Sequence, residues 1–454
     1  MKNRKTNYTK LNYINQIEKF FQENRTPSEE FRLGTEMEFF VINNESGEAV
    51  TYFEDNGIND ILKALAEKGW QVCERHEEHI LCLLKNGDEI NLEPGAQIEF
   101  SFSPRHSIEE FENGFLEICR DLLPILEKFD YSLFSLGYQP VTAIDSIPIL
   151  PKKRYDHMYR YFSEQGKYAH NMMKGTASLQ VSLDYKSEKD FSRKFLAAYW
   201  LMPIIYAVLD NSPFFEGDRA DSWGIRSQIW ANCDKDRSGL LPNKFMKAGV
   251  EFRDYAEFII NMPAIFNPYN IEQYVGEKPF FEILKSGSMS EKIIEHILSM
   301  SFTDIRAKKY LEIRMADTLP FPQALGYIAL LKGLLYEEDN LKKLESFAVK
   351  TGINSIKNSR DGIPHQGINL EYTEGKTLHQ WLNRLFDMAV KGLKTKEIDY
   401  LNQLKNFLKQ YCPPRNAVVN KNKINSRSKN SLFVEELNYC NINRNLEGKF
   451  KYES

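Results

Sequence analysis

The sequence contains few of the residues that build soft-metal sites or disulfide frameworks. Only 6 cysteines and 8 histidines occur among 454 residues, and the cysteines show no CxxC or other metal-ligand spacing. Cys73 and Cys82 are close enough in sequence to meet across a hairpin, but structural or incidental thiols are the favoured interpretation. The low cysteine content predicts a cytoplasmic location.

Long apolar runs and a strong net charge are also missing. The longest uncharged apolar stretch, residues 195–209, is shorter than the roughly 18 residues that span a bilayer, so we expect a buried core helix there. The first 21 residues lack a secretory pattern. With 59 basic and 63 acidic residues the formal charge is −4, which favours neither nucleic acid nor a membrane as partner.

Two familiar motifs are incomplete. Gly375, Lys376 and Thr377 imitate the end of a phosphate-binding loop, but Leu370 stands where its first glycine belongs. The segment at residues 76–79 does not have the HExxH spacing of a zinc protease. Any nucleotide must therefore be held by metal ions and individual basic side chains.

Hydrophobic residues make up 42% and aromatic residues 13% of the chain, which is sufficient for a large core. The predicted elements mix strands with helices without regular βαβ alternation, so the fold class is α+β with a mainly antiparallel sheet. We expect a catalytic domain over residues 1–411 and a weakly packed or disordered Asn/Lys-rich tail over residues 412–454. Helices are expected at residues 12–21, 58–68, 107–129, 155–168, 190–210, 252–260, 290–299, 321–335 and 377–393, and strands at residues 33–42, 71–75, 80–85, 89–103, 132–137, 176–185 and 310–315.

Three of the predicted strands carry carboxylates on one face. Glu36 and Glu38 are two residues apart, so they project side by side. In the second strand, a Pro-Gly bend can turn Glu93 toward Glu99. The third strand presents Glu312 with Arg314. Each alone has an ordinary explanation, a solvated edge strand or a surface ion pair.

Together, five glutamates and one arginine on one sheet face would be costly unless cations neutralise them. Hard oxygen ligands without histidine or cysteine indicate Mg²⁺, or Mn²⁺, rather than zinc. Two further segments indicate substrate handling. A strand face of Thr176, Ser178 and Gln180 can hydrogen-bond an amino acid, although a solvent-facing strand is an equal alternative. Arg226 and Trp230, one helical turn apart, offer a guanidinium and an aromatic wall.

Six segments, in order, resemble the plant-type glutamate–cysteine ligase family over roughly residues 10 to 400. They are GTEME (34–38), LEPGAQIE (92–99), MMKGTASLQVSLD (172–184), RSQIW (226–230), DKDRSG (234–239) and YLEIRMAD (310–317). The resemblance implies a curved, mainly antiparallel sheet forming a funnel flanked by helices, similar to the catalytic domains of glutamine synthetase and guanidino kinases.

The resemblance also implies a reaction, the first step of glutathione biosynthesis. ATP would phosphorylate the γ-carboxylate of L-glutamate, and the amine of L-cysteine would attack the acyl phosphate to give γ-glutamylcysteine, ADP and phosphate. The roles implied by motif position are Mg²⁺ ligation by Glu36, Glu38, Glu93, Glu99 and Glu312, catalysis by Arg314 and Glu312, and substrate binding by Met173, Thr176, Ser178, Gln180, Arg226, Trp230 and Arg237.

Some features depart from the family or stay open. Met37 stands where plant members carry histidine, and the tail from about Pro413 does not match. Residues 235–241 are our candidate for a segment that closes over the site. Another amine acceptor, a guanidino phosphotransferase or a binding protein without catalysis remain alternatives, and either a monomer or a homodimer is expected.

Overall fold

The computed structural model describes residues 2–243, 249–284, 289–419 and 434–447. Its centre is an open nine-stranded sheet in the order β14-β15-β7-β1-β5-β4-β3-β2, with β6 added beside β1. Neighbouring strands of this sheet pair antiparallel. This confirms the predicted fold class. The strands are β1 (Leu33–Asn43), β2 (Gln71–His76), β3 (His79–Lys85), β4 (Asp88–Leu92), β5 (Ile98–Arg105), β6 (Tyr131–Phe134), β7 (Ser178–Leu183), β14 (Ile305–Ala307) and β15 (Leu311–Asp317).

One face of the sheet is apolar and packs on helices. Met37 and Phe39 of β1 and Phe100 of β5 are at most 1% exposed, as the alternation of side chains across a strand requires. Phe115 of α3 (Ile108–Lys128) contacts the rings of Phe39 and Phe100 and stacks on Phe321 at 4.2 Å. The predicted serine start of α3 is present as a capping box.

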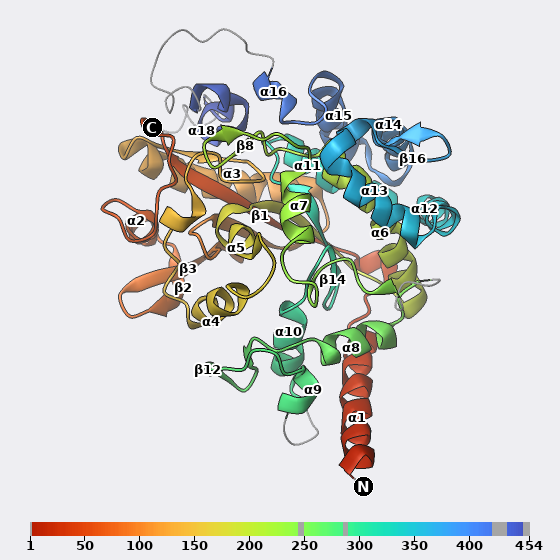
Figure 1. Ribbon diagram of the computed structural model, residues 1–454. Helices are drawn as coiled ribbons and strands as arrows, with labels where there is room; N and C mark the ends of the chain where they lie inside the picture. Colours follow the sequence, from red (N-terminus) through yellow and green to blue (C-terminus); the bar gives the residue numbers. More distant parts are fainter. Residues whose placement is uncertain (1, 244–248, 285–288, 420–433, 448–454) are drawn as a thin grey trace.

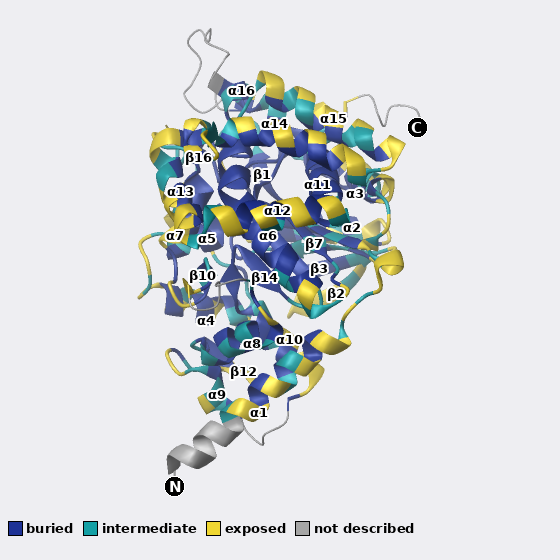
Figure 2. Cartoon of the chain, turned by 90° about the vertical axis from the view of Figure 1, so that its right-hand side faces the viewer, coloured by how far each residue is buried: buried dark blue, intermediate teal, exposed yellow. Residues whose placement is uncertain are grey.

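Helices from the second half of the chain cover this core. Residues 195–208 of the apolar stretch lie within α6 (Glu188–Val208), which is buried on nearly all sides, and Leu209 caps the helix. Against α6 pack α12 (Glu338–Thr351), α13 (Ile353–Gln366) and α14 (Leu378–Ala389). Helix α11 (Gln323–Leu335) packs on α14 and on α15 (Thr395–Gln410), and these helices gather together in Figure 1. In Figure 2 the outward faces of α12, α14 and α15 are exposed, whereas α11 is mostly buried. No described helix has the length and apolar character needed to cross a bilayer.

A smaller group of elements projects from one side of the sheet (Figure 1). It contains α1 (Lys2–Glu23), α8 (Phe252–Asn261), α9 (Phe280–Ile283), α10 (Glu291–Ser299) and the hairpin of β11 (Phe266–Asn267) and β12 (Asn270–Tyr274). The rings of Phe21 and Phe252 stack at 5.5 Å and join α1 to α8. The remaining elements are α2 (Ile58–Glu67), α4 (Lys153–Phe162), α5 (Ala169–Gly175), α7 (Ile225–Ala231), β8 (Phe214–Phe215), β9 (Asp218–Arg219), β10 (Ser238–Gly239), β13 (Phe302–Thr303), β16 (Glu371–Thr373), β17 (Lys376–Thr377), α16 (Asn416–Val419) and α18 (Ile442–Asn445).

Two local expectations were wrong. The helix predicted at residues 155–168, with its end near Gly166, instead runs from Lys153 to Phe162. Beyond it the chain bonds to another segment, since the Gly166 amide donates to the Cys233 carbonyl at 2.7 Å. Cys73 and Cys82 form a disulfide between β2 and β3 rather than free thiols. Their Cα atoms are 5.3 Å apart, within the range a disulfide bridges.

The described parts of the tail are packed, in contrast to the weak packing expected for it. Val434, Leu437 and Cys440 are buried in a cluster with Phe40 and Phe134, at the end of the sheet where β6 joins β1. The average polar composition of the tail conceals these few well-spaced apolar residues. The sequence suggests that residues 432–437 are the part of the tail that could dock, and of these residues 432–433 lie outside the described residues. The division at residue 411 stays a prediction.

Candidate active site

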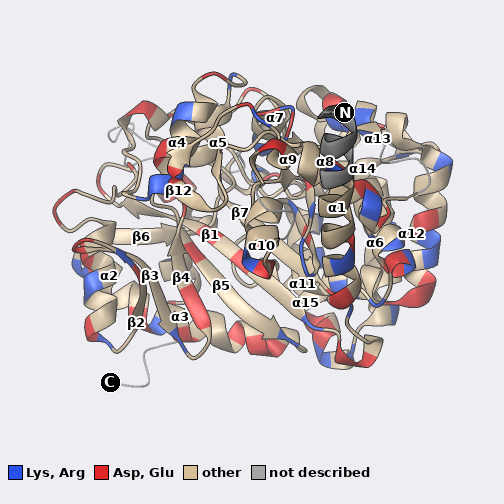
Figure 3. Cartoon of the chain, turned by 90° about the horizontal axis from the view of Figure 1, so that it is seen from below, with Lys and Arg blue, Asp and Glu red and all other residues tan. Residues whose placement is uncertain are grey.

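The polar face of the sheet gathers the carboxylates that the sequence placed two residues apart. Glu38 of β1 lies directly opposite Glu99 of β5, and Glu36 lies opposite Gln180 of β7. Glu312 is on β15, the strand that pairs with the other edge of β7. Figure 3 shows acidic segments on central strands, near β1 and β4. The predicted alternation therefore does produce one shared acidic face.

The bend after β4 brings Glu93 to the same place. The Glu93 amide donates to the Gln97 carbonyl at 3.0 Å, and the Gly95 amide donates to the Gln97 side chain at 2.9 Å. Gly95 approaches Lys174 so closely that a Cβ would lie 2.6 Å from its carbonyl oxygen. Ala96 adopts a positive φ of 67°. These contacts fix a tight turn that directs Glu93 toward the sheet.

Glu38, Glu93 and Glu99 form a cluster in which one carboxylate oxygen from each lies within 4.8 Å of the others. Burial, followed by repulsion from Glu93, raises the pKa of Glu38 to about 7. Burial and repulsion from Glu36, Glu93 and Glu38 raise the pKa of Glu99 well above its usual range. Negative charge is therefore in excess here, and an oxygen-ligated divalent cation fits this donor set.

Glu312 has a different environment, because cations surround it. Its carboxylate pairs with Arg306 at 2.5 Å, Lys308 at 3.1 Å and Arg314 at 3.0 Å. Burial alone would raise the pKa of Glu312, but these three partners hold it well below its usual range. A metal ion would have to compete with three ion pairs for this carboxylate, so its metal role stays a prediction with less geometric support than that of Glu38, Glu93 and Glu99.

The sequence reasoning missed Arg306 and Lys308. They lie on and just after β14, where Arg306 pairs in register with Glu312. The same two-residue alternation that identified the glutamates would have found them, since Arg306 and Lys308 are two positions apart. With Arg314 they provide three cations beside two carboxylates, Glu36 and Glu312. This part of the face is suited to bind phosphate oxygens.

A small enclosed cavity of about 60 Å³ lies beside the acidic cluster. It includes Met173, Thr176, Ser178, Arg226, Trp230 and Arg314, six of the residues predicted for substrate binding or catalysis. The full lining comprises Glu38, Glu93, Pro94, Gln97, Met158, Met172, Met173, Thr176, Ser178, Arg226, Trp230, Phe302 and Arg314. Segments distant in sequence therefore converge on one pocket.

Helix α7 supplies one wall of this pocket. Arg226 is buried and donates to the carbonyl oxygens of Arg314 at 2.8 Å and Met315 at 3.0 Å. The Nε of Arg226 and the indole Nε1 of Trp230 are buried without a hydrogen-bond partner among the described residues. Buried donors without partners are uncommon. A carboxylate in the pocket would satisfy them.

The strand β7 holds Glu38 in place. The Ser178 backbone amide and hydroxyl donate to its carboxylate at 2.6 and 3.0 Å, and the Gln180 amide donates at 2.8 Å. Gln180 also accepts a hydrogen bond from Arg314. Gln180 is thus placed to orient Glu38 and Arg314, and it does not line the cavity. The Thr176 hydroxyl lines the cavity but donates to the Met172 carbonyl at 2.8 Å.

The structure does not support the predicted role of Arg237 or the predicted closing segment. The Arg237 side chain is fully buried, pairs with Asp234 at 2.5 Å and donates to the Pro263 carbonyl at 2.7 Å. It does not line the pocket. Residues 235–241 include β10, which pairs with β13 and contains buried Gly239. This segment is part of the packed structure.

Comparison with known proteins supports the fold and the family. The chain is 28% identical over 407 residues to glutamate–cysteine ligase B, chloroplastic, of Oryza sativa subsp. japonica, covering 87% of this chain and 81% of the relative. It is 29% identical over 405 residues to the chloroplastic glutamate–cysteine ligase of Arabidopsis thaliana, covering 86% and 76%. A crystal structure of glutamate–cysteine ligase from Francisella tularensis in complex with AMP has the same fold, with a TM-score of 0.54, 13% identity and coverage of 93% and 89%.

The comparison corrects the expected cytoplasmic location. The plant relatives are named chloroplastic, so the comparison speaks against the cytoplasmic location expected from the cysteine content. Low cysteine content and a missing secretory pattern indicate only whether a protein is exported, and neither feature distinguishes the cytoplasm from a plastid.

The family model of glutamate–cysteine ligase family 2 matches residues 32–405. This range contains every strand of the central sheet, the carboxylate cluster, the cations around Glu312 and helix α7. The chain therefore belongs to glutamate–cysteine ligase family 2.

Proposed function

We propose that the protein joins the γ-carboxylate of glutamate to the amine of cysteine at the expense of ATP. A γ-carboxylate oxygen attacks the terminal phosphorus of ATP, and the bond to ADP breaks. The cysteine nitrogen then attacks the resulting acyl phosphate, so that a carbon–nitrogen bond forms while the carbon–oxygen bond to phosphate breaks. The products are γ-glutamylcysteine, ADP and phosphate. No described feature favours a guanidino phosphotransferase over this reaction.

One observation carries the proposal: an acidic cluster and a cationic cluster lie on the same buried sheet face, beside a pocket with buried donors. Glu38, Glu93 and Glu99 would hold Mg²⁺, which supplies charge neutralisation to the phosphates when bound. Glu36 adjoins both clusters. Its charge raises the pKa of Glu99 in the acidic cluster, and the cations around Glu312 lower the pKa of Glu36 itself. Phosphoryl transfer needs chiefly such positioning and electrostatic stabilisation.

Arg314 is placed to act on the transferring phosphoryl group. It lines the pocket together with Glu38, and its guanidinium is fixed by Gln180 and Glu312. Because both partners hold the group in advance, little reorganisation is needed when negative charge develops. Arg306 and Lys308 would stabilise the remaining phosphate oxygens. A second cavity of about 150 Å³, lined in part by Glu36 and Tyr310, offers space on this side of the face.

The glutamate would occupy the enclosed pocket, with a carboxylate against Arg226 and Trp230. At about 60 Å³ the cavity is small, so we expect its walls to move apart when an amino acid binds. Met158, Met172 and Met173 line it, and methionine side chains rearrange readily. The enclosure would then protect the acyl phosphate from water.

ADP release tests the proposal directly. Purified protein is supplied with ATP, Mg²⁺ and glutamate, with and without cysteine, and ADP and the peptide product are measured. We expect rapid ADP release only with both amino acids. Release at the cysteine-free rate would contradict the proposal, and a panel of other amines would show whether a different acceptor is used.

A further inference from the structure

An arginine beyond the matched family region contacts the chain segment that leads into α7. Arg415 lies in the tail, and the family match ends at residue 405. Its guanidinium donates to the carbonyl oxygens of Ala220 at 2.8 Å and Ser222 at 2.7 Å, and pairs with Asp210 at 3.1 Å. Arg415 is only 7% exposed. A buried guanidinium with three partners fixes the geometry of all of them.

Asp210 links this contact to the first residue of the helix. Its carboxylate pairs with Arg415 and also accepts the backbone amide of Gly224 at 2.8 Å. Gly224 precedes α7 with a left-handed backbone, φ 63° and ψ 49°, and has no side chain to cap the helix. The Asp210 carboxylate therefore binds an amide at the helix start that would otherwise lack a side-chain partner.

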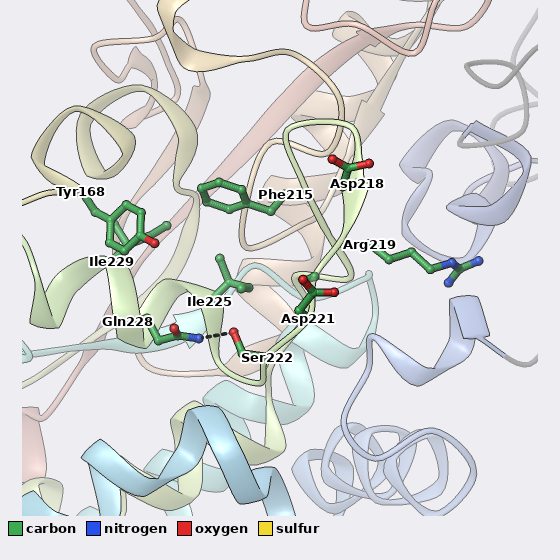
Figure 4. A pocket seen from close by; sticks show the side chains of 10 residues that line it. Tyr168, Phe215, Asp218, Arg219, Asp221, Ser222, Ile225, Gln228 and Ile229 are labelled. Atoms are coloured by element: carbon green, nitrogen blue, oxygen red, sulfur yellow. Dashed lines mark hydrogen bonds between the residues drawn. The ribbon is translucent and has the colours of Figure 1, made fainter.

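The segment before α7 borders a cavity. A cavity of about 310 Å³ opens beside it, lined by Ala220, Asp221 and Ser222 on one side and by Ile225, Gln228 and Ile229 of α7 on the other (Figure 4). These α7 residues are distinct from Arg226 and Trp230, which face the enclosed pocket. Because a cavity borders one face of α7, the hydrogen bonds at the start of the helix contribute more to its position.

The charges at Asp210 are shared with the pocket as well. The charge of Asp210 raises the pKa of Asp317, and the charge of Arg226 lowers the pKa of both Asp317 and Glu38. The Asp317 carboxylate accepts hydrogen bonds from the Asn211 amide at 2.8 Å and the Ser212 hydroxyl at 2.7 Å. Arg415 thus supplies a positive charge to Asp210, while Arg226 supplies one to Asp317.

We propose that Arg415 is a positioning residue for the glutamate pocket: through Asp210, Ala220 and Ser222 it sets the start of α7 and so the placement of Arg226 and Trp230. The inference rests on the proposed function for its substrate, but its structural part does not. The proposal gives a role in the active site to a residue of the tail, which lies outside the matched family region.

The kinetic test compares R415M, R415K and the control R219M. Arg219 also contacts the tail, at Glu436 with 2.8 Å, but it is exposed and does not bond to the segment before α7. We expect R415M to raise the KM for glutamate by about tenfold, with the KM for ATP changed by less than about twofold. R415K keeps the charge but loses the planar guanidinium with its several donors, so its KM for glutamate should lie between those of R415M and wild type. R219M should match wild type.

Hydrogen exchange supplies a readout that does not require turnover. In R415M the amides of residues 224–231 should exchange faster, while those of α14 stay unchanged. Equal α7 protection together with an unchanged KM for glutamate in folded R415M would overturn the inference. So would a lower kcat at unchanged KM, because that indicates only a smaller folded fraction. If R415M does not fold, R415K decides by the same criteria. Absence of ligase activity in wild type would refute the proposed function, and the exchange experiment would still test the positioning.

Discussion

At the scale of single residues, position on a strand determined chemistry. Glu36, Glu38, Glu99 and Glu312 lie on one sheet face because each sits at the same phase of the two-residue alternation. The environments then separate them: Glu38 and Glu99 face other carboxylates, whereas Glu312 faces three cations. Identical side chains thus acquire pKa shifts of opposite direction.

Replacing Glu99 tests the metal assignment without relying on activity. We expect E99Q to abolish the increase in melting temperature that Mg²⁺ causes in wild type, because the cluster loses one of its three ligands. Without Mg²⁺, the variant should melt above wild type, since a repelled buried carboxylate is removed. Thermal unfolding with and without Mg²⁺ measures both effects, and exposed Glu78 in E78Q is the control. An undiminished Mg²⁺ effect in E99Q would exclude Glu99 as a ligand.

Arg314 provides a second residue-scale test. R314K should lower kcat by about tenfold or more, because lysine cannot contact Gln180, Glu312 and a phosphoryl oxygen with one planar group. Steady-state kinetics with saturating substrates gives kcat, and circular dichroism verifies folding. R384K, at an exposed pair with Glu374, should behave as wild type. Normal turnover in folded R314K would remove Arg314 from the mechanism.

At the scale of elements, amphipathic periodicity predicted α3, α8, α10 and α14 well, since each buries one face. It did not identify α12, α13 or α15. Their apolar positions are sparser, and α13 carries a proline near its end. These helices form because α6 and α11 present a large apolar surface on which they pack, so tertiary contacts outweigh weak local preference.

The α10 helix contains a group that makes stability depend on pH. Burial, followed by the charge of Arg154, lowers the pKa of His296 to about 4, and its ring lies 5.0 Å from Phe266. Between pH 6.5 and 4 the unfolded chain therefore binds a proton that the folded state does not, so stability falls as pH falls. Between pH 7 and 5, the free energy of unfolding of H296F should fall by on the order of 1 kcal/mol less than that of wild type. Urea unfolding at both pH values measures this, and equal losses in both proteins would contradict it.

At the scale of the whole molecule, the tail connects to the sheet and the active site. Its described residues bury apolar side chains against β1 and β6 and place Arg415 against the segment before α7. The sequence composition predicted a weakly packed or disordered tail. The contacts instead bring residues about 200 positions apart, such as Asp210 and Arg415, together at 3.1 Å.

Truncation after residue 419 separates these two contributions, because it retains Arg415 but removes Val434, Leu437 and Cys440. Each buried apolar side chain contributes about 1.5 to 3 kcal/mol to stability. The free energy of unfolding of the truncated protein should therefore be lower by several kcal/mol. Phe40 and Phe134 would become exposed and should promote aggregation. Chemical unfolding and light scattering check this, and a wild-type unfolding midpoint would show that the tail adds no stability.

The sequence by itself determined which residues could share a face. Strict alternation fixed Glu36 with Glu38 and Glu312 with Arg314, and helical spacing fixed Arg226 with Trp230, because these relations depend only on local backbone geometry. Ordered motifs then identified the family. Tertiary structure alone decided how the strands pair, that Glu312 is surrounded by Arg306 and Lys308, that Arg237 pairs with Asp234, and that Arg415 contacts the segment before α7. Those outcomes depend on contacts between distant segments, which local spacing does not encode.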